Sequence, residues 1–143
     1  MLIYKDIYNE ILVNSCNALN EEGGIIGAYN DAISISYHDT GIASKRRCVY
    51  IPDTNTLNDV LKKWNKNDIT FMGMYHTHFR NVCSLSEGDK TYIVKILNAM
   101  PHEIEKLFFP LVLLPSKTIV CYEAKIISGE PVIKNERLTI ISR

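Results

Sequence analysis

Residues 74–89 read MYHTHFRNVCSLSEGD and place two histidines, a serine and an aspartate at fixed intervals. One residue separates His76 from His78, seven separate His78 from Ser86, and two more precede Asp89. In a β-strand, residues i and i+2 share a face, so the two imidazoles project together about 7 Å apart along the chain. Two histidines and a carboxylate are ligands that zinc accepts, and a catalytic site leaves the fourth position to water.

The serine and the aspartate of this stretch also fit the start of a helix. Ser86 followed three residues later by Asp89 is a capping pattern. The serine accepts hydrogen bonds from backbone N–H groups, and the negative charge of the aspartate interacts favourably with the helix dipole. A lone H-x-H in a strand is common without any metal. The two interpretations are compatible, because the loop 79–85 is long enough to fold a rigid, capped Asp89 back toward the histidines.

The rest of the chain predicts an α/β fold, a mixed sheet with a few helices packed on it. Apolar residues at three- and four-residue spacing predict helices, with Trp64 in the core, and alternating apolar and polar residues predict strands. We expect helices over 3–19, 54–67 and 86–100, and strands over 23–29, 32–37, 46–52, 69–78, 107–114, 118–127 and 132–141.

Composition limits the classes of protein to consider. A length of 143 residues predicts one domain over 1–143, and zero formal net charge gives no field that attracts nucleic acid. The strongest apolar run, 107–115, is too short to span a bilayer, so a soluble cytoplasmic protein without a membrane partner is expected. The four cysteines form no C-x-x-C pair and predict reduced, mostly buried thiols; they are Cys16, Cys48, Cys83 and Cys121.

The spacing H-x-H-x7-S-x-x-D resembles the complete motif of the JAMM (MPN+) metalloproteases. The apolar strand 71–75, with its glycine, leads into the first histidine as in that family, and Pro52-Asp53 precedes the preceding helix. Phe79 departs from the pattern, since a proline often follows the second histidine there. Long insertions typical of eukaryotic members are absent, so the likeness is to the small prokaryotic branch.

The resemblance implies a JAB/MPN fold related to cytidine deaminases and one Zn²⁺ per chain on His76, His78 and Asp89. It also implies a glutamate just before a Gly-rich strand, in the pattern E-x-G-G, that binds the water on the zinc ion. Glu21 fits this spacing in Glu21-Glu22-Gly23-Gly24, and Glu22 is the alternative base if the turn is one residue shorter.

In such a protease the glutamate takes the proton of the attacking water, and Ser86 helps to stabilise the oxyanion. The family hydrolyses peptide or isopeptide bonds after the C-terminal tail of ubiquitin-like proteins. Small prokaryotic members are also linked to sulfur-carrier proteins. The expected partner is therefore a ubiquitin-like or sulfur-carrier tail, with the oligomeric state left open.

Other interpretations of the same residues stay open at this point. One alternative is a metal-free binding module on the JAB fold. The other is a RadC-like DNA-associated protein, although RadC-type proteins usually carry the motif H-N-H-P-S-G, which differs from this sequence after the second histidine. A zinc deaminase needs H-x-E and P-C-x-x-C, and the sequence contains neither. His38 and His102 carry no motif and are expected on the surface or in turns, and Lys45-Arg46-Arg47 as a solvated strand entry.

Overall fold

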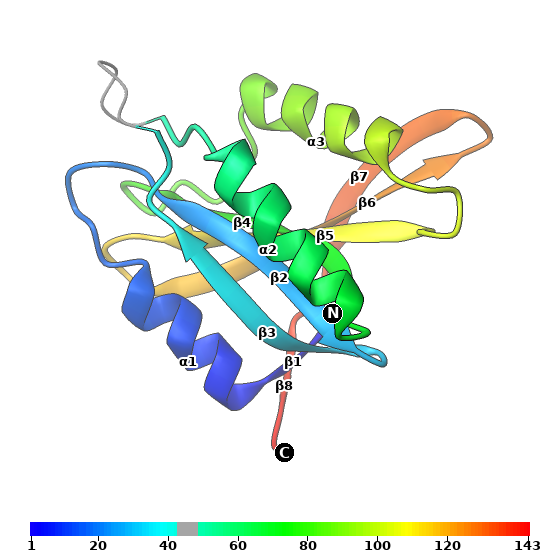
Figure 1. The fold of residues 1–143 in the computed structure, drawn as a ribbon. Helices are drawn as coiled ribbons and strands as arrows, with labels where there is room; N and C mark the ends of the chain where they lie inside the picture. Colours follow the sequence, from blue (N-terminus) through cyan, green and yellow to red (C-terminus); the bar gives the residue numbers. More distant parts are fainter. Residues whose placement is uncertain (43–48) are drawn as a thin grey trace.

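A mixed β-sheet runs through the part of the chain that the computed structural model describes, residues 1–42 and 49–143 (Figure 1). Its eight described strands lie in the order β7-β6-β5-β4-β2-β3-β1-β8. The elements are β1 Leu2–Tyr4, α1 Lys5–Asn14, β2 Gly23–Tyr29, β3 Ala32–Asp39, α2 Thr54–Lys66, β4 Thr70–His78, α3 Glu87–Ala99, β5 Lys106–Leu113, β6 Thr118–Ile127, β7 Glu130–Glu136 and β8 Thr139–Ile141.

Helices cover both faces of this sheet (Figure 1). Helices α2 and α3 bury their apolar residues in one core cluster, and α1 buries its own in a second. Side chains alternate between faces along a strand, so Met74 joins the first cluster while its neighbour Tyr75 joins the second. No helix of the described residues is long and apolar enough to cross a membrane.

Strand β4 lies in the middle of the sheet and carries both histidines of the motif. It pairs antiparallel with β2 and parallel with β5. Gly73 sits in this strand at φ 138°, and a β-carbon there would collide with the backbone carbonyl of Phe108 on β5. The glycine therefore allows the close approach of β4 and β5 that sets the register of the following histidines.

The predicted helix 54–67 is confirmed as α2. The side chain of Asp53 accepts a hydrogen bond from the backbone N–H of Thr56 and so caps its first turn. Trp64 is buried at 6 % exposure, which confirms its predicted place in the core.

The predicted helix 3–19 is wrong at both ends. Leu2–Tyr4 form strand β1, where Ile3 pairs with Ile33 and Ile140 at 1 % exposure. The helix ends after Asn14, before the predicted stop near residue 20. The side chain of Asn17 accepts hydrogen bonds from the N–H groups of Leu19 and Asn20. These bonds form a local turn that competes with helical hydrogen bonding.

Two strand predictions and one cysteine prediction also need correction. The segment 132–141 is two strands, β7 and β8, at opposite edges of the sheet. Residues 49–52 of the predicted strand 46–52 are not in a strand, and the rest of it, with Lys45-Arg46-Arg47 and Cys48, lies outside the described residues. Cys121 is buried, but Cys16 and Cys83 are exposed, so the described thiols are free but not mostly buried.

Candidate active site

The end of β4 and the start of α3 meet at the predicted metal ligands. Left-handed backbone at Arg80 and Asn81, with φ of 55° and 53°, turns the chain sharply after His78. The N–H of Asn81 donates to the carbonyl of Leu114 at 2.9 Å and fixes the turn against the end of β5. The chain then returns to place α3 beside the histidines.

Asp89 is held by a capping box at the start of α3. The backbone N–H of Asp89 donates to Ser86 Oγ at 3.0 Å, and the backbone N–H of Ser86 donates to Asp89 Oδ2 at 2.8 Å. The predicted cap is therefore confirmed, and it orients the carboxylate toward β4. The geometry that caps the helix thus also places the Asp89 carboxylate beside the two histidines.

His76, His78 and Asp89 bring their ligand atoms within 4.8 Å of one another. The two Nε2 atoms lie 2.9 Å apart. Asp89 Oδ1 lies 3.2 Å from His76 Nε2, and Oδ2 lies 3.1 Å from His78 Nε2. Ligands about 2.0–2.1 Å from a tetrahedral zinc ion lie about 3.3–3.4 Å apart, so the three separations suit one small cation.

The protonation of His78 also suits metal binding. Its Nδ1 lies 2.9 Å from the carbonyl oxygen of Val82. A carbonyl can only accept, so Nδ1 carries the hydrogen. Nε2 keeps its lone pair for a metal when the ring is neutral, and donates to Asp89 when the ring is protonated. A backbone carbonyl behind a ligating histidine is the arrangement that fixes ring orientation in metal sites.

Charges within this cluster shift two pKa values in opposite directions. Burial works against ionised Asp89, but hydrogen bonds from His76 and His78 outweigh it and hold the pKa of that carboxyl far below its usual range. Burial also works against charged His78, yet its hydrogen bonds to Asp89 and the Val82 carbonyl raise its pKa. In the metal-free protein the aspartate is therefore an anion beside the two rings at neutral pH.

The two candidate glutamates lie in different environments. Glu21 lines the same cleft as the histidines, and burial raises its pKa, partly offset by His76 and His78. Glu22 does not line the cleft; its buried side chain contacts His38 and Asn17. The structure therefore brings Glu21, and not Glu22, to the ligand cluster.

Ser86 lies on the rim of the cleft with an exposed side chain. Its Oγ accepts the N–H of Asp89, so its hydroxyl hydrogen remains free to donate. The cap thereby orients a hydrogen-bond donor next to the ligand cluster.

A cleft of about 1010 Å³ opens over these residues. Most of its wall is apolar or aromatic, from Tyr50, Phe79, Val82, Leu85, Tyr92 and Phe109. Its polar lining consists of the histidine–aspartate cluster and Glu21, together with Arg80, Ser84 and Ser86. Such a cleft with a few convergent polar groups is the usual form of a substrate site.

Sequence reasoning did not identify several residues around this site. Tyr50 enters the cleft from a segment that carries no motif, and Tyr92 lies on a helix where it was expected in the apolar stripe. The expected surface position of His38 is wrong, since both its ring nitrogens are bonded, whereas His102 is exposed in a turn as expected. The burial of His38 could have been inferred only from its pairing with Gly24 on the adjacent strand. That pairing is known only once the register of the two strands is known.

Comparison of the sequence with protein-family models and with curated proteins finds no match. Solved structures do match. A protein from Desulfitobacterium hafniense aligns with TM-score 0.72 and 19 % identity over 99 % of this chain and 93 % of its own. A JAB1/MPN domain protein from Archaeoglobus fulgidus aligns with TM-score 0.57 and 15 % identity over 99 % and 100 %, and a Salinibacter ruber protein with 0.59 and 14 % over 99 % and 92 %.

At these identities the likeness concerns the fold alone. The kinship with cytidine deaminases stays a prediction. The chain thus has an α/β fold, a mixed sheet with three described helices, similar to that of a JAB1/MPN domain protein, and it carries a His-His-Asp cluster at metal-binding distance.

Proposed function

We propose that this chain is a zinc-dependent metallopeptidase of the JAMM type. The observation that carries the proposal is the convergence of His76, His78 and Asp89 in a cleft that Glu21 also lines. A strand, a helix cap and the segment before β2 supply these residues, and Glu21 lies far from the other three in the chain. A helix cap alone explains Asp89, and a surface position alone explains a single histidine. Neither explains why all four side chains meet in one cleft.

The residues have complementary roles in this proposal. A zinc ion on His76, His78 and Asp89 would supply Lewis acidity and activate water for attack near neutral pH. Glu21 takes the proton of the attacking water and gives it to the leaving amine, a task that its raised pKa favours. The free hydroxyl hydrogen of Ser86 donates to the oxyanion that develops on the scissile carbonyl.

The proposed substrate is the C-terminal tail of a ubiquitin-like or sulfur-carrier protein, cleaved at a peptide or isopeptide bond. Support comes from the size and the apolar walls of the cleft, which suit an extended peptide with aliphatic side chains better than a highly charged ligand. The substrate class comes from the resemblance of the motif, and the turnover panel described below distinguishes between the two kinds of partner.

Metal content is the first test. Wild-type protein purified without chelator should contain one zinc per chain, and Asp89→Ala should lose it. Glu87→Ala is the matched control, because Glu87 is also an acidic residue in the first turn of α3 but belongs to no ligand cluster of the described residues. No divalent metal in the wild type would leave a metal-free binding module as the better function. Loss of zinc in Glu87→Ala as well would contradict the assignment of Asp89 as a ligand.

Turnover is the second test. The panel comprises linear extensions and lysine conjugates of a ubiquitin-like protein and of a sulfur carrier, followed by mass spectrometry. Glu21→Gln should keep zinc and lose hydrolysis, because it keeps the shape of the side chain and removes its basicity. Full hydrolysis by Glu21→Gln would contradict its assigned role.

A further inference from the structure

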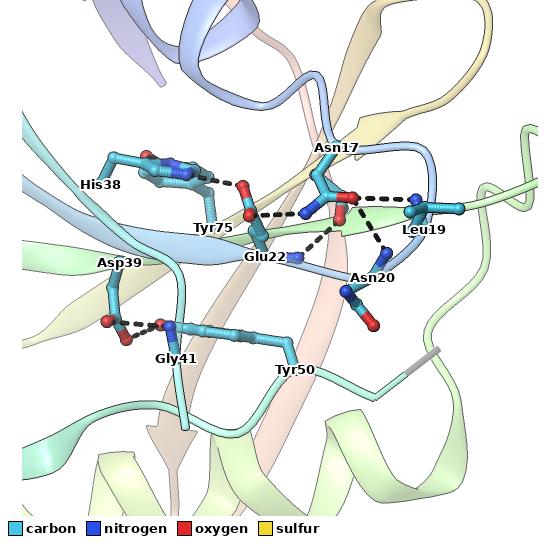
Figure 2. A network of polar contacts seen from close by, with 10 residues as sticks. Asn17, Leu19, Asn20, Glu22, His38, Asp39, Gly41, Tyr50 and Tyr75 are labelled. Atoms are coloured by element: carbon cyan, nitrogen blue, oxygen red, sulfur yellow. Dashed lines mark hydrogen bonds and ion pairs between the residues drawn. The ribbon is translucent and has the colours of Figure 1, made fainter. Parts of the chain in front are cut away.

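A second polar network lies directly beside the candidate base. Its centre is the carboxylate of Glu22, at 8 % exposure (Figure 2). Oε2 of Glu22 lies 2.8 Å from His38 Nε2, and Oε1 accepts a hydrogen bond from Asn17 Nδ2 at 3.0 Å. Both carboxylate oxygens are therefore occupied, and neither faces the cleft.

The direction of each hydrogen bond follows from the chemistry of the partners. A carboxylate only accepts, so His38 Nε2–H donates to Glu22, and Nδ1 accepts from the hydroxyl of Tyr75 at 3.0 Å. Burial holds the pKa of the Tyr75 phenol above its usual value, so the hydroxyl keeps its hydrogen. The result is a chain of donors, Tyr75 to His38 to Glu22, with no unsatisfied member.

The backbone of Glu22 is fixed as firmly as its side chain. Its N–H donates to Thr77 Oγ1 at 2.9 Å, and its carbonyl accepts from the N–H of Thr77 at 2.8 Å. Thr77 lies between His76 and His78, so the residue after Glu21 is bonded twice to the middle of the histidine motif.

The segment before Glu22 is fixed as well. Asn17, which binds Glu22, orders the loop before it by accepting the N–H groups of Leu19 and Asn20 (Figure 2). In the same segment, the backbone of Tyr50 hydrogen-bonds to the carboxyl group of Glu21. The hydroxyl of Tyr50 donates to Asp39 Oδ2 at 2.7 Å.

We propose that Glu22, clamped by His38 and Asn17, is a positioning residue that fixes the backbone from which Glu21 reaches the metal ligands. This inference rests on the proposed function of Glu21 as base. Neighbouring residues in an extended chain point to opposite sides, so anchoring Glu22 on the α1 side of the sheet turns Glu21 into the cleft on the other. The sequence contains two adjacent glutamates because one anchors and the other reacts.

Energetics favour a positioning role over a purely stabilising one. A buried carboxylate must recover its desolvation energy through its partners, and well-packed apolar residues often match such a network in stability. Outer partners of metal-site residues do affect function, and their loss typically lowers activity or metal affinity 10–100-fold.

The test compares Glu22→Ala with Glu22→Gln. The amide of glutamine can accept from Asn17 and donate to His38 in its other tautomer, so the anchor survives without the charge. We expect Glu22→Gln to keep kcat within about 3-fold of wild type, and Glu22→Ala to lower kcat about 10–100-fold with KM and zinc content unchanged. Glu123→Ala is the matched control: Glu123 is likewise buried, at 4 % exposure, ion-paired with lysines, and outside the cleft.

Amide hydrogen exchange of residues 20–24, with and without zinc, provides a readout other than activity. Exchange there should accelerate at least about 10-fold in Glu22→Ala and remain slow in Glu22→Gln and Glu123→Ala. Wild-type exchange in Glu22→Ala overturns the proposal. So does equal loss of kcat in Glu22→Gln and Glu22→Ala with exchange unchanged, because Glu22 would then act as the base. If wild-type protein hydrolyses nothing, the proposed function fails, while the exchange data still decide whether Glu22 anchors this segment.

Discussion

Replacing Asp89 by alanine should abolish the stabilisation of the folded protein by zinc. A ligand at a hundredfold its Kd stabilises the folded state by about 2.7 kcal/mol. Unfolding entropy is about 2.1 cal/mol/K per residue, which for 143 residues gives about 0.3 kcal/mol/K. Zinc should therefore raise the Tm of wild-type protein by about 9 °C, and that of Asp89→Ala by almost nothing.

The metal-free proteins differ by a smaller amount. Asp89→Ala removes the acceptor of the Ser86 N–H in the capping box, which costs about 1 kcal/mol and lowers Tm by about 3 °C, in addition to the stability from its contacts with the two histidines. Ser86→Ala is the matched control, because it removes the other half of the same box and leaves the carboxylate in place. It should lose a similar 3 °C without zinc and keep the zinc-dependent rise.

The assay is thermal unfolding in a zinc buffer that fixes the free concentration of the metal, monitored by circular dichroism. A full zinc-dependent rise in Asp89→Ala would refute the reasoning, since zinc would then bind elsewhere, for example at the exposed thiols of Cys16 and Cys83. Equal loss of the rise in Ser86→Ala would also refute it, because the effect would then follow from the cap.

Four further outcomes follow from the same contacts. Metal-free protein should be most stable between about pH 3.8 and 6.5, measured by urea unfolding: the lowered pKa of Asp89 gives stability that is lost as pH falls below this range, and the raised pKa of His78 gives stability that is lost as pH rises above it. Zinc binding should strengthen with pH across the same upper limit, because the ligand imidazoles must be neutral; an affinity independent of pH would argue against histidine ligands. Gly73→Ala should lower the unfolding free energy by about 3 kcal/mol or more, because a β-carbon at φ 138° meets the backbone of β5; an unchanged urea midpoint would show that the strands can separate there. Thr77→Val should lower the unfolding free energy by about 1–3 kcal/mol, because the N–H of Glu22 loses its acceptor. An unchanged rate of amide exchange at residue 22 would show that this hydrogen bond does not stabilise the segment.

The sequence by itself determined the elements whose cause is local. The helix 54–67 and the strand 69–78 follow from periodicity, and the Ser86–Asp89 cap follows from a spacing that one helical turn enforces. The alternation within a strand predicted that His76 and His78 share a face. These contacts join residues close in the chain, so side-chain pattern alone carries the information.

Only the tertiary structure decided what depends on pairing between distant strands. Residues 2–4 look like the first turn of a helix, yet they form a strand because two other strands offer their edges on either side. The spacing favoured Glu21 as the base and left Glu22 as the alternative if the turn is one residue shorter. The choice between them depends on Thr77, 55 residues from Glu22, and on His38, because these partners hold Glu22 on one side of the sheet and turn Glu21 to the other. No local pattern encodes that choice, because it depends on the register in which β2 pairs with β3 and β4.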